Sequence, residues 1–132
     1  MSDLDVRGKR LTVRAETAKN GRTIELPVRD DLLRFLIHDI PVDPDAALLG
    51  REFRNISKGF GMARKRAGFP WFTFHSTRRC FASWLSSAGC SYPCLKSLLG
   101  HSTASGDVTL RYAMPSWGER VQAVRALPGI LD

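Results

Sequence analysis

The sequence has no long hydrophobic run, and this absence limits where the chain can work. No stretch of its 132 residues is long and uniformly apolar enough to cross a bilayer or to act as a signal peptide. Hydrophobic residues make up 43% of the chain and charged residues 25%, which is typical of a globular domain. We therefore expect a soluble, cytoplasmic protein with one hydrophobic core and no membrane partner.

Cysteine is also scarce, with only Cys80, Cys90 and Cys94 in the chain. An odd number of cysteines without a secretory signal does not favour a disulfide framework. Cys90, Cys94 and His101 have neither the spacing nor the fourth ligand of a common zinc site. We expect the cysteines to be small hydrophobic side chains rather than metal ligands.

Acidic residues are outnumbered by basic ones. Lysine and arginine total 20 against 13 aspartate and glutamate, giving a formal net charge of +7, and fifteen of the basic residues are arginine. The planar guanidinium group of arginine can donate two parallel hydrogen bonds to a phosphate. The composition therefore favours a polyanionic partner, although a merely soluble basic domain would carry the same charge.

Alternating polar and apolar residues predict a β-hairpin near the N-terminus. The alternation covers residues 11–15 and 24–28, and Asn20-Gly21 has the residues of a two-residue type I′ turn. This turn would pair Val13 with Val28 and place Lys19 at the hairpin tip.

The remaining sequence has helical periodicity. The predicted helices cover residues 30–40, 51–67, 76–88, 95–99 and 117–127, with one further turn or two over 107–114. The expected helix starts are Asp30, Ser76 or Thr77, and a capping box of Ser116 with Glu119. The expected stops are Pro41, Gly89 and Gly100. The fold class is therefore α+β, a small antiparallel sheet followed by a mainly helical assembly.

His75 and Arg78 are the first candidate functional pair. They are three residues apart near a predicted helix start, so their side chains lie on the same side of the helix. An imidazole and a guanidinium group beside exposed helix N–H groups suit a phosphate. A single HxxR pattern, however, is more often part of an ordinary core helix.

Four ordered segments carry a family resemblance. They are residues 73–85 built on HxxR, the sequence Leu98-Leu99-Gly100-His101, the sequence Arg111-Tyr112-Ala113, and residues 17–22 around Lys19. Together they resemble the C-terminal catalytic domain of the tyrosine recombinases, the phage integrase family. The resemblance extends from about residue 3 to about residue 127.

The resemblance implies site-specific DNA recombination or integration through a 3′-phosphotyrosyl intermediate, without a metal or nucleotide cofactor. Tyr112 would be the nucleophile, and His75 would assist removal of its proton. Arg78 and His101 would stabilise charge on the phosphate oxygens. Lys19 would protonate the departing 5′ oxygen.

The resemblance makes double-stranded DNA the expected partner. Phosphate contacts are expected from Arg54, Lys58, Arg64, Lys65, Arg66 and Arg79. A solvated basic helix face is the alternative for each of them. Residues 117–131 are expected to pack on a neighbouring protomer if the protein forms a homo-oligomer on DNA. Tyr92, the other tyrosine, precedes the LLGH-like sequence, where the family does not place its nucleophile.

The sequence departs from the family pattern in two places. The first of the family's two catalytic arginines belongs to a segment upstream of residue 3. Residues 1–132 are therefore expected to be a catalytic domain without that segment and without the N-terminal core-binding domain, and to be a poor recombinase alone. The interval from His101 to Tyr112 is also about two residues longer than in the family, with flexible Gly106 inside it.

Other functions remain open at this stage. The chain could be a catalytically inactive, DNA-binding remnant of an integrase, or an enzyme similar to a type IB topoisomerase, which uses the same chemistry. A structural or protein-binding domain is the alternative from a different class. Covalent trapping of DNA on Tyr112, relaxation of supercoiled DNA without a site preference, and DNA affinity would separate these possibilities.

Overall fold

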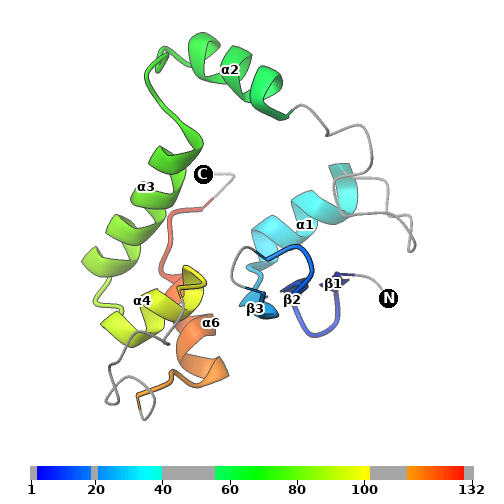
Figure 1. Ribbon diagram of the computed structural model, residues 1–132, viewed down its shortest axis with the longest axis vertical. Helices are drawn as coiled ribbons and strands as arrows, with labels where there is room; N and C mark the ends of the chain where they lie inside the picture. The colour runs from blue at the N-terminus through cyan, green and yellow to red at the C-terminus, as the bar shows by residue number, and fades with distance from the viewer. Residues whose placement is uncertain (1–2, 19–20, 40–55, 102–112, 130–132) are drawn as a thin grey trace.

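The computed structural model describes residues 3–18, 21–39, 56–101 and 113–129. A three-stranded antiparallel sheet in the order β1-β2-β3 is followed by helices, which confirms the predicted α+β class (Figure 1). The strands are β1 (Leu4–Asp5), β2 (Arg10–Val13) and β3 (Ile24–Pro27). The helices are α1 (Asp30–Asp39), α2 (Ile56–Arg66), α3 (Phe74–Ser87), α4 (Tyr92–Leu98) and α6 (Trp117–Arg125).

The register of β2 with β3 differs from the predicted hairpin. Val13 pairs with Ile24 and not with Val28, a shift of four positions. An even shift leaves the same side chains on the same face, so the apolar alternation cannot distinguish the two registers. The strand ends early because the carbonyl of Arg14 accepts hydrogen bonds from the next turn, at 2.9 and 3.1 Å. The predicted two-residue turn is therefore wrong, and Lys19 lies outside the described residues.

The third strand, β1, was not predicted. Leu4 pairs with Leu11 of β2, and a tight turn joins the two strands. The carboxylate of Asp5 accepts a hydrogen bond of 2.9 Å from the N–H of Gly8, which stabilises this turn. A strand of two residues is too short to show an alternating pattern, so the sequence gives no signal for it.

Helix α3 begins before the predicted start. Thr73 is the N-cap, since its hydroxyl accepts a hydrogen bond of 3.1 Å from the N–H of Ser76, and the hydroxyl of Ser76 accepts one of 3.0 Å from the N–H of Thr73. Ser76 is therefore the third helical residue and His75 the second. Asp30 is likewise the first residue of α1 rather than its cap, because the N–H of Leu33 donates to the carbonyl of Arg29, the residue before Asp30.

The capping box at the start of α6 is confirmed. Ser116 accepts a hydrogen bond of 3.2 Å from the N–H of Glu119, and the carboxylate of Glu119 accepts one of 2.7 Å from the N–H of Ser116. The backbone and hydroxyl of Ser116 lower the pKa of Glu119. The predicted stops at Gly89 and Gly100 are also confirmed, since both glycines follow helix ends with positive φ.

Buried side chains form two small clusters instead of the single expected core. One cluster joins the sheet to α1 through Leu4, Val28, Leu33 and Leu36. The other joins α3, α4 and α6 through Leu85, Cys94, Leu98 and Val124, and Leu26 of β3 packs against it. Strand β3 therefore links the two halves of the hydrophobic interior.

Arginine side chains connect the sheet region to α6. Arg29 donates hydrogen bonds to the carbonyls of Leu127 and Pro128, just after α6. Arg120 donates one of 3.1 Å to the carbonyl of Glu25 in β3. Charged donors at carbonyls beyond a helix end also complement the helix dipole.

Trp117, the first residue of α6, lies between two guanidinium groups. The central carbon of Arg10 is 4.4 Å from the ring centroid and that of Arg120 is 4.8 Å away. Arg10 also forms an ion pair of 2.9 Å with Glu25. This arginine–tryptophan stack ties β2 and β3 to the start of α6.

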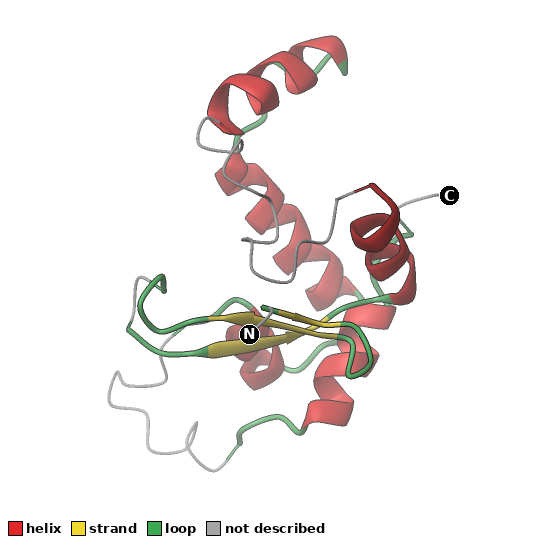
Figure 2. Ribbon diagram, turned by 90° about the vertical axis from the view of Figure 1, so that its right-hand side faces the viewer, coloured by secondary structure: helices red, strands yellow, loops and turns green. Residues whose placement is uncertain are grey.

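Helix α2 lies at the end of α3 opposite α4 and α6 in both ribbon views (Figures 1 and 2). Phe60 of α2 stacks on Phe74 of α3, with 4.1 Å between ring centroids. Arg64 donates a hydrogen bond of 2.7 Å to the carbonyl of Phe72 in the connection. Trp84 of α3 is 51% exposed. Within the described ranges, no helix is long and apolar enough to span a membrane.

We expect the arginine–tryptophan stack to stabilise the fold measurably. Replacing Trp117 with alanine removes two cation–π contacts and should lower the free energy of unfolding by about 2 kcal/mol. Urea unfolding followed by circular dichroism would measure the change. Trp84→Ala is the control, because that ring is half exposed, and its effect should stay below about 0.5 kcal/mol. Equal losses in the two variants would contradict the role of the stack.

Candidate functional site

The end of α4 places His101 at the surface. Leu99 is the C-cap, Gly100 has a φ of 66°, and the N–H groups of Gly100 and His101 bond to the carbonyls of Ser97 and Lys96 at 3.1 and 3.0 Å. This arrangement is a Schellman motif, which fixes the backbone of the residue after the glycine. The side chain of His101 is exposed.

A hydrogen bond joins the two motifs recognised in the sequence. The guanidinium group of Arg78 in α3 donates from Nη2 to the carbonyl of Leu99, with a distance of 2.6 Å. Leu99 is two residues before His101, so the bond connects the HxxR segment to the end of the LLGH-like segment. It also supplies a charged donor at a helix C-terminus, where carbonyl groups lack helical partners.

Strand β3 lies against the same helix end. A Cβ atom built on Gly100 would lie 2.7 Å from Cδ1 of Ile24, the first residue of β3. The connection that enters β3 therefore approaches the carboxyl end of α4. Lys19 is five positions before Ile24 in the chain and lies outside the described residues.

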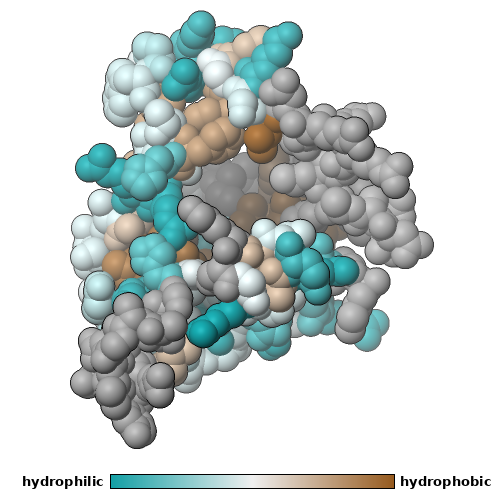
Figure 3. All heavy atoms as spheres, in the orientation of Figure 1, coloured by the Kyte–Doolittle hydropathy of each residue, from teal (hydrophilic) through white to brown (hydrophobic). Residues whose placement is uncertain are grey.

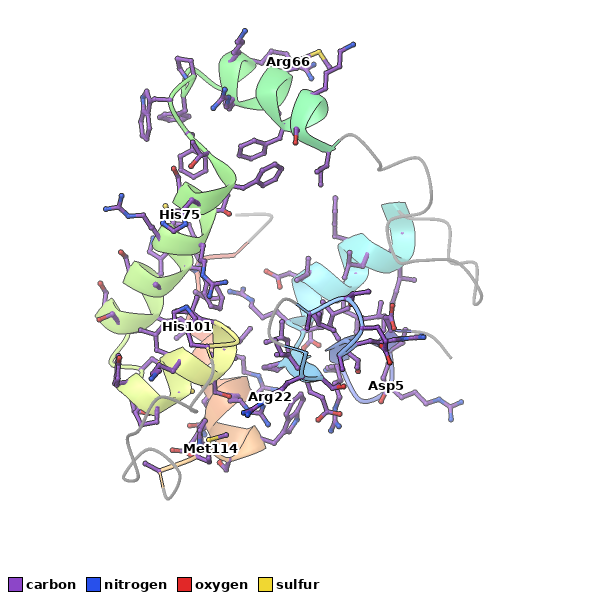
Figure 4. The ribbon with its side chains drawn as sticks, viewed as in Figure 1. Asp5, Arg22, Arg66, His75, His101 and Met114 are labelled. Atoms are coloured by element: carbon purple, nitrogen blue, oxygen red, sulfur yellow. The ribbon has the colours of Figure 1, made fainter. Side chains whose placement is uncertain are left out.

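The described candidates come from neighbouring elements. His75 lies in the first turn of α3, Arg78 in the second, and His101 three residues after the end of α4, and all three residues are exposed. Figure 4 shows His75 on α3 and His101 at the end of α4. The hydrogen bond from Arg78 to Leu99 brings these segments together. Tyr112 and Arg54 lie outside the described residues, as do residues 107–112 of the predicted turn.

Charge is divided unevenly along the chain. Residues 53–106, which include α2, α3 and α4, contain eight lysines and arginines and no aspartate or glutamate. The rest of the chain carries twelve basic and thirteen acidic residues and is almost neutral. The net positive charge therefore resides in the segment that carries His75, Arg78 and His101. A uniform positive potential of this kind attracts a polyanion.

Residues 53–106, the acid-free segment, contain no carboxylate side chain that could pair with their own cations. The four ion pairs found among the described residues all lie in the sheet region and the start of α1, between Asp3 and Asp31. Within the predicted DNA-contact set, Lys58, Lys65, Arg66 and Arg79 are exposed. The space-filling view shows hydrophilic side chains over the outer parts of α2 and α3 (Figure 3).

Arg64 differs from the other members of that set. It is half-buried, and its Nη1 atom donates to the carbonyl of Phe72, so part of its guanidinium group holds α2 to the connection with α3. Its Nε atom is buried without a hydrogen-bond partner among the described residues. Arg64 therefore has a structural role in addition to its predicted contact with DNA.

A model of the family described as "Phage integrase family" matches residues 1–116. The chain belongs to the phage integrase family. Comparison with curated proteins and with solved structures found no match. The family in general consists of tyrosine recombinases, which carry out site-specific DNA recombination, and membership implies DNA as a partner.

Two features of this integrase-family site were not predicted from the sequence. The carbonyl of Leu99 is the partner of Arg78, and Ile24 of β3 packs at Gly100. The local sequence Leu-Leu-Gly does predict a helix end, but a partner 21 residues away in the chain cannot be read from local pattern. No group of three potential metal ligands occurs in the part of the chain that the structure describes.

Gly100 provides a test of how closely β3 supports the LLGH-like segment of this integrase. Gly100→Ala places a methyl group on a backbone with positive φ and against Ile24. Gly89→Ala also places a methyl group at positive φ, but no other atom lies within 4 Å of it. We expect Gly89→Ala to cost about 1 kcal/mol of unfolding free energy and Gly100→Ala to cost about 1 kcal/mol more.

The excess cost should fall when the neighbouring side chain is shortened. Ile24→Val removes Cδ1, the atom nearest the added methyl group, so the double variant should be more stable than the sum of the two single effects. Urea unfolding of the four proteins gives the coupling energy. Simple additivity would show that β3 does not restrict the end of α4.

Proposed function

We propose that the chain is the catalytic part of a tyrosine recombinase that cleaves and rejoins DNA through a 3′-phosphotyrosyl intermediate on Tyr112. The observation that carries the proposal is the hydrogen bond from Arg78 to the carbonyl of Leu99, at the edge of an acid-free basic segment. It supports a shared role for the HxxR and LLGH-like motifs, because it joins their segments while His75, Arg78 and His101 remain exposed.

Arg78 suits a scissile phosphate in both charge and geometry. Its bond to Leu99 uses Nη2, and Arg78 remains exposed, so its other N–H groups are free to bind a substrate phosphate in this proposal. A guanidinium group can bridge two oxygens of one phosphate, and it neutralises the charge that builds in the transition state. His101, held by the Schellman motif, would donate a further hydrogen bond to the same oxygens.

The proposed step transfers one phosphoester bond to the enzyme. The phenol oxygen of Tyr112 attacks the phosphorus, its proton passes to His75, and the bond to the 5′ oxygen breaks. Lys19 gives a proton to that oxygen as it leaves. The new ester stores the bond energy, so rejoining is the reverse step with a different 5′ hydroxyl, and nucleotide hydrolysis is not required.

Two parts of this proposal depend on residues beyond the described ranges. Tyr112 and Lys19 are assigned by their motifs. The described segment after Lys19 contains β3, and the described segment after Tyr112 leads into α6. We also propose that these 132 residues alone react slowly, because they contain no match to the first catalytic arginine of the family. The loss of one preorganised donor costs roughly 10² to 10³ in rate. The site of action is proposed to be the cytoplasm, where the DNA is.

A nicked suicide substrate provides the direct test. Release of a short fragment next to the scissile phosphate prevents rejoining, so even a slow reaction accumulates a covalent complex. We expect a DNA adduct that maps to Tyr112 by peptide mass spectrometry and that disappears in Tyr112→Phe. Tyr92→Phe is the matched control and should retain the adduct, because Tyr92 stacks near Lys96 on α4 and stands outside the proposed chemistry.

The possible results separate the competing functions. An adduct on Tyr92 would contradict the assignment of the nucleophile. DNA binding without any adduct would favour the inactive DNA-binding remnant. Relaxation of supercoiled plasmid without dependence on a defined site would favour topoisomerase-like activity, whereas the proposed recombinase depends on its site.

The acid-free segment makes a second, independent prediction about DNA affinity. The double variant Lys65→Gln with Arg66→Gln removes two exposed charges from the last turn of α2. On a duplex of arbitrary sequence, the slope of log K against log salt should become shallower by about 2. Fluorescence anisotropy between about 0.05 and 0.2 M salt measures this slope.

Arg7→Gln is the control for the double variant. Arg7 is exposed in the turn between β1 and β2, outside the acid-free segment, and its loss should leave the slope unchanged. If Arg7→Gln changes the slope as much per charge as the α2 variant does, DNA binds without preference for the proposed surface.

A further inference from the structure

Two of the three cysteines lie together where α3 turns into α4. Cys94 is in the first turn of α4 and is 2% exposed, in a cluster with Leu85 and Leu98. Cys90 is half-buried and packs against the same cluster. The thiol of Cys90 donates a hydrogen bond of 3.6 Å to the carbonyl of Ser91, and it lies near enough to Cys94 to raise the pKa of that thiol. Cys80, by contrast, lies within α3 and outside this cluster.

The local backbone causes this pairing. Gly89 ends α3 with a φ of 78°, and the N–H of Cys90 bonds back to the carbonyl of Leu85 at 3.0 Å. Ser91 then caps α4 and accepts a hydrogen bond of 3.4 Å from the N–H of Cys94. Cys90 and Cys94 therefore flank the start of α4, and both belong to the cluster and the pocket that α6 shares.

The half-buried Cys90 and the buried Cys94 both line a surface pocket. A pocket of about 290 Å³ is lined by both cysteines, by the turn between α3 and α4, and by one side of α6. Most of the other lining residues are small, namely Ala88, Gly89, Ser91, Ala123 and Ala126. Small side chains leave room for an attacking reagent beside Cys90.

We propose that Cys90 and Cys94 form a redox-reactive dithiol that a small-molecule disulfide, such as oxidised glutathione, converts to an intrachain disulfide. The thiolate of Cys90 attacks one sulfur of the reagent, forming a mixed disulfide and releasing one glutathione thiolate. Cys94 then loses its proton and attacks the sulfur of Cys90, releasing the second glutathione. The pair loses two electrons and two protons, and the reagent gains them as two thiols.

The second step should be the slow one. Burial and the contact with Cys90 raise the pKa of Cys94 to about 12, and the nearby Glu119 raises it while Arg120 lowers it. Only the thiolate attacks. While the pH is below the pKa of Cys94, each increase of one pH unit should therefore accelerate the closing step about tenfold. A mixed disulfide at Cys90 is therefore expected to accumulate before the ring closes.

Cys94, one end of the disulfide, lies in α4, the short helix whose carboxyl end is at the candidate site. Cys94 and Leu98 belong to one cluster, and α4 leads directly to the carbonyl that accepts the bond from Arg78. About 7 Å of helix separates Cys94 from Leu99. A change in the first turn of α4 would thus be transmitted through a single rigid element.

Mass spectrometry of the intact chain tests the proposal without any recombination assay. The folded, reduced protein is incubated with oxidised glutathione, remaining thiols are blocked, and a chymotryptic peptide spanning residues 86–95 is isolated, which excludes Cys80. We expect a peptide that carries no blocking group and is lighter by about 2 Da, preceded by the glutathione adduct of Cys90.

Variants identify each partner. Cys80→Ser should react like the natural chain, and Cys90→Ser should form no ring. Cys94→Ala, which keeps an apolar group in the core, should stop at the mixed disulfide. The proposal is overturned if the natural chain also stops at the mixed disulfide, if Cys80 takes part in the bridge, or if Cys90 does not react at all.

Discussion

Hydrogen bonds from arginine to backbone carbonyls hold the elements of this small chain together. Arg29 bonds to the carbonyls after α6, Arg64 to that of Phe72, Arg78 to that of Leu99 and Arg120 to that of Glu25. Each bond joins segments that meet at the edge of a small apolar cluster. Eight hydrophobic side chains are buried in the described part of the chain, so such charge-assisted bonds carry an unusual share of the tertiary structure.

Features that depend on neighbouring residues were predictable, and features that depend on distant partners were not. The stop at Gly100 follows from one residue and one helix end, and the box of Ser116 with Glu119 from a four-residue pattern. The register of β2 and β3 was wrong because two registers that differ by an even shift place the same side chains on the same face. The bond from Arg78 to Leu99 spans two helices, so no local pattern contains it.

The candidate site was predictable to a similar degree. The motif residues His75 and His101 were identified from their order, and the bond between their segments agrees with a shared site. Total charge was a weaker guide, because arginine serves two purposes here. Several arginines are engaged in the fold, as Arg10 is with Trp117 and Glu25, while the cations of residues 53–106 face no acidic neighbour in their own segment. The distribution of charge, more than its sum, indicates a DNA-facing surface.

Arg78 makes one observed bond, to Leu99, and has one proposed contact, to a phosphate, and the two together would account for arginine rather than lysine at this position. One Nη atom is committed to the carbonyl of Leu99, which fixes the end of α4 and with it the backbone of His101. A planar fork with five N–H donors can make that bond and still present a second edge to a phosphate. The compact ammonium group of lysine could satisfy the carbonyl or the phosphate, but not both in fixed geometry. The same side chain that assembles the site can therefore take part in its chemistry.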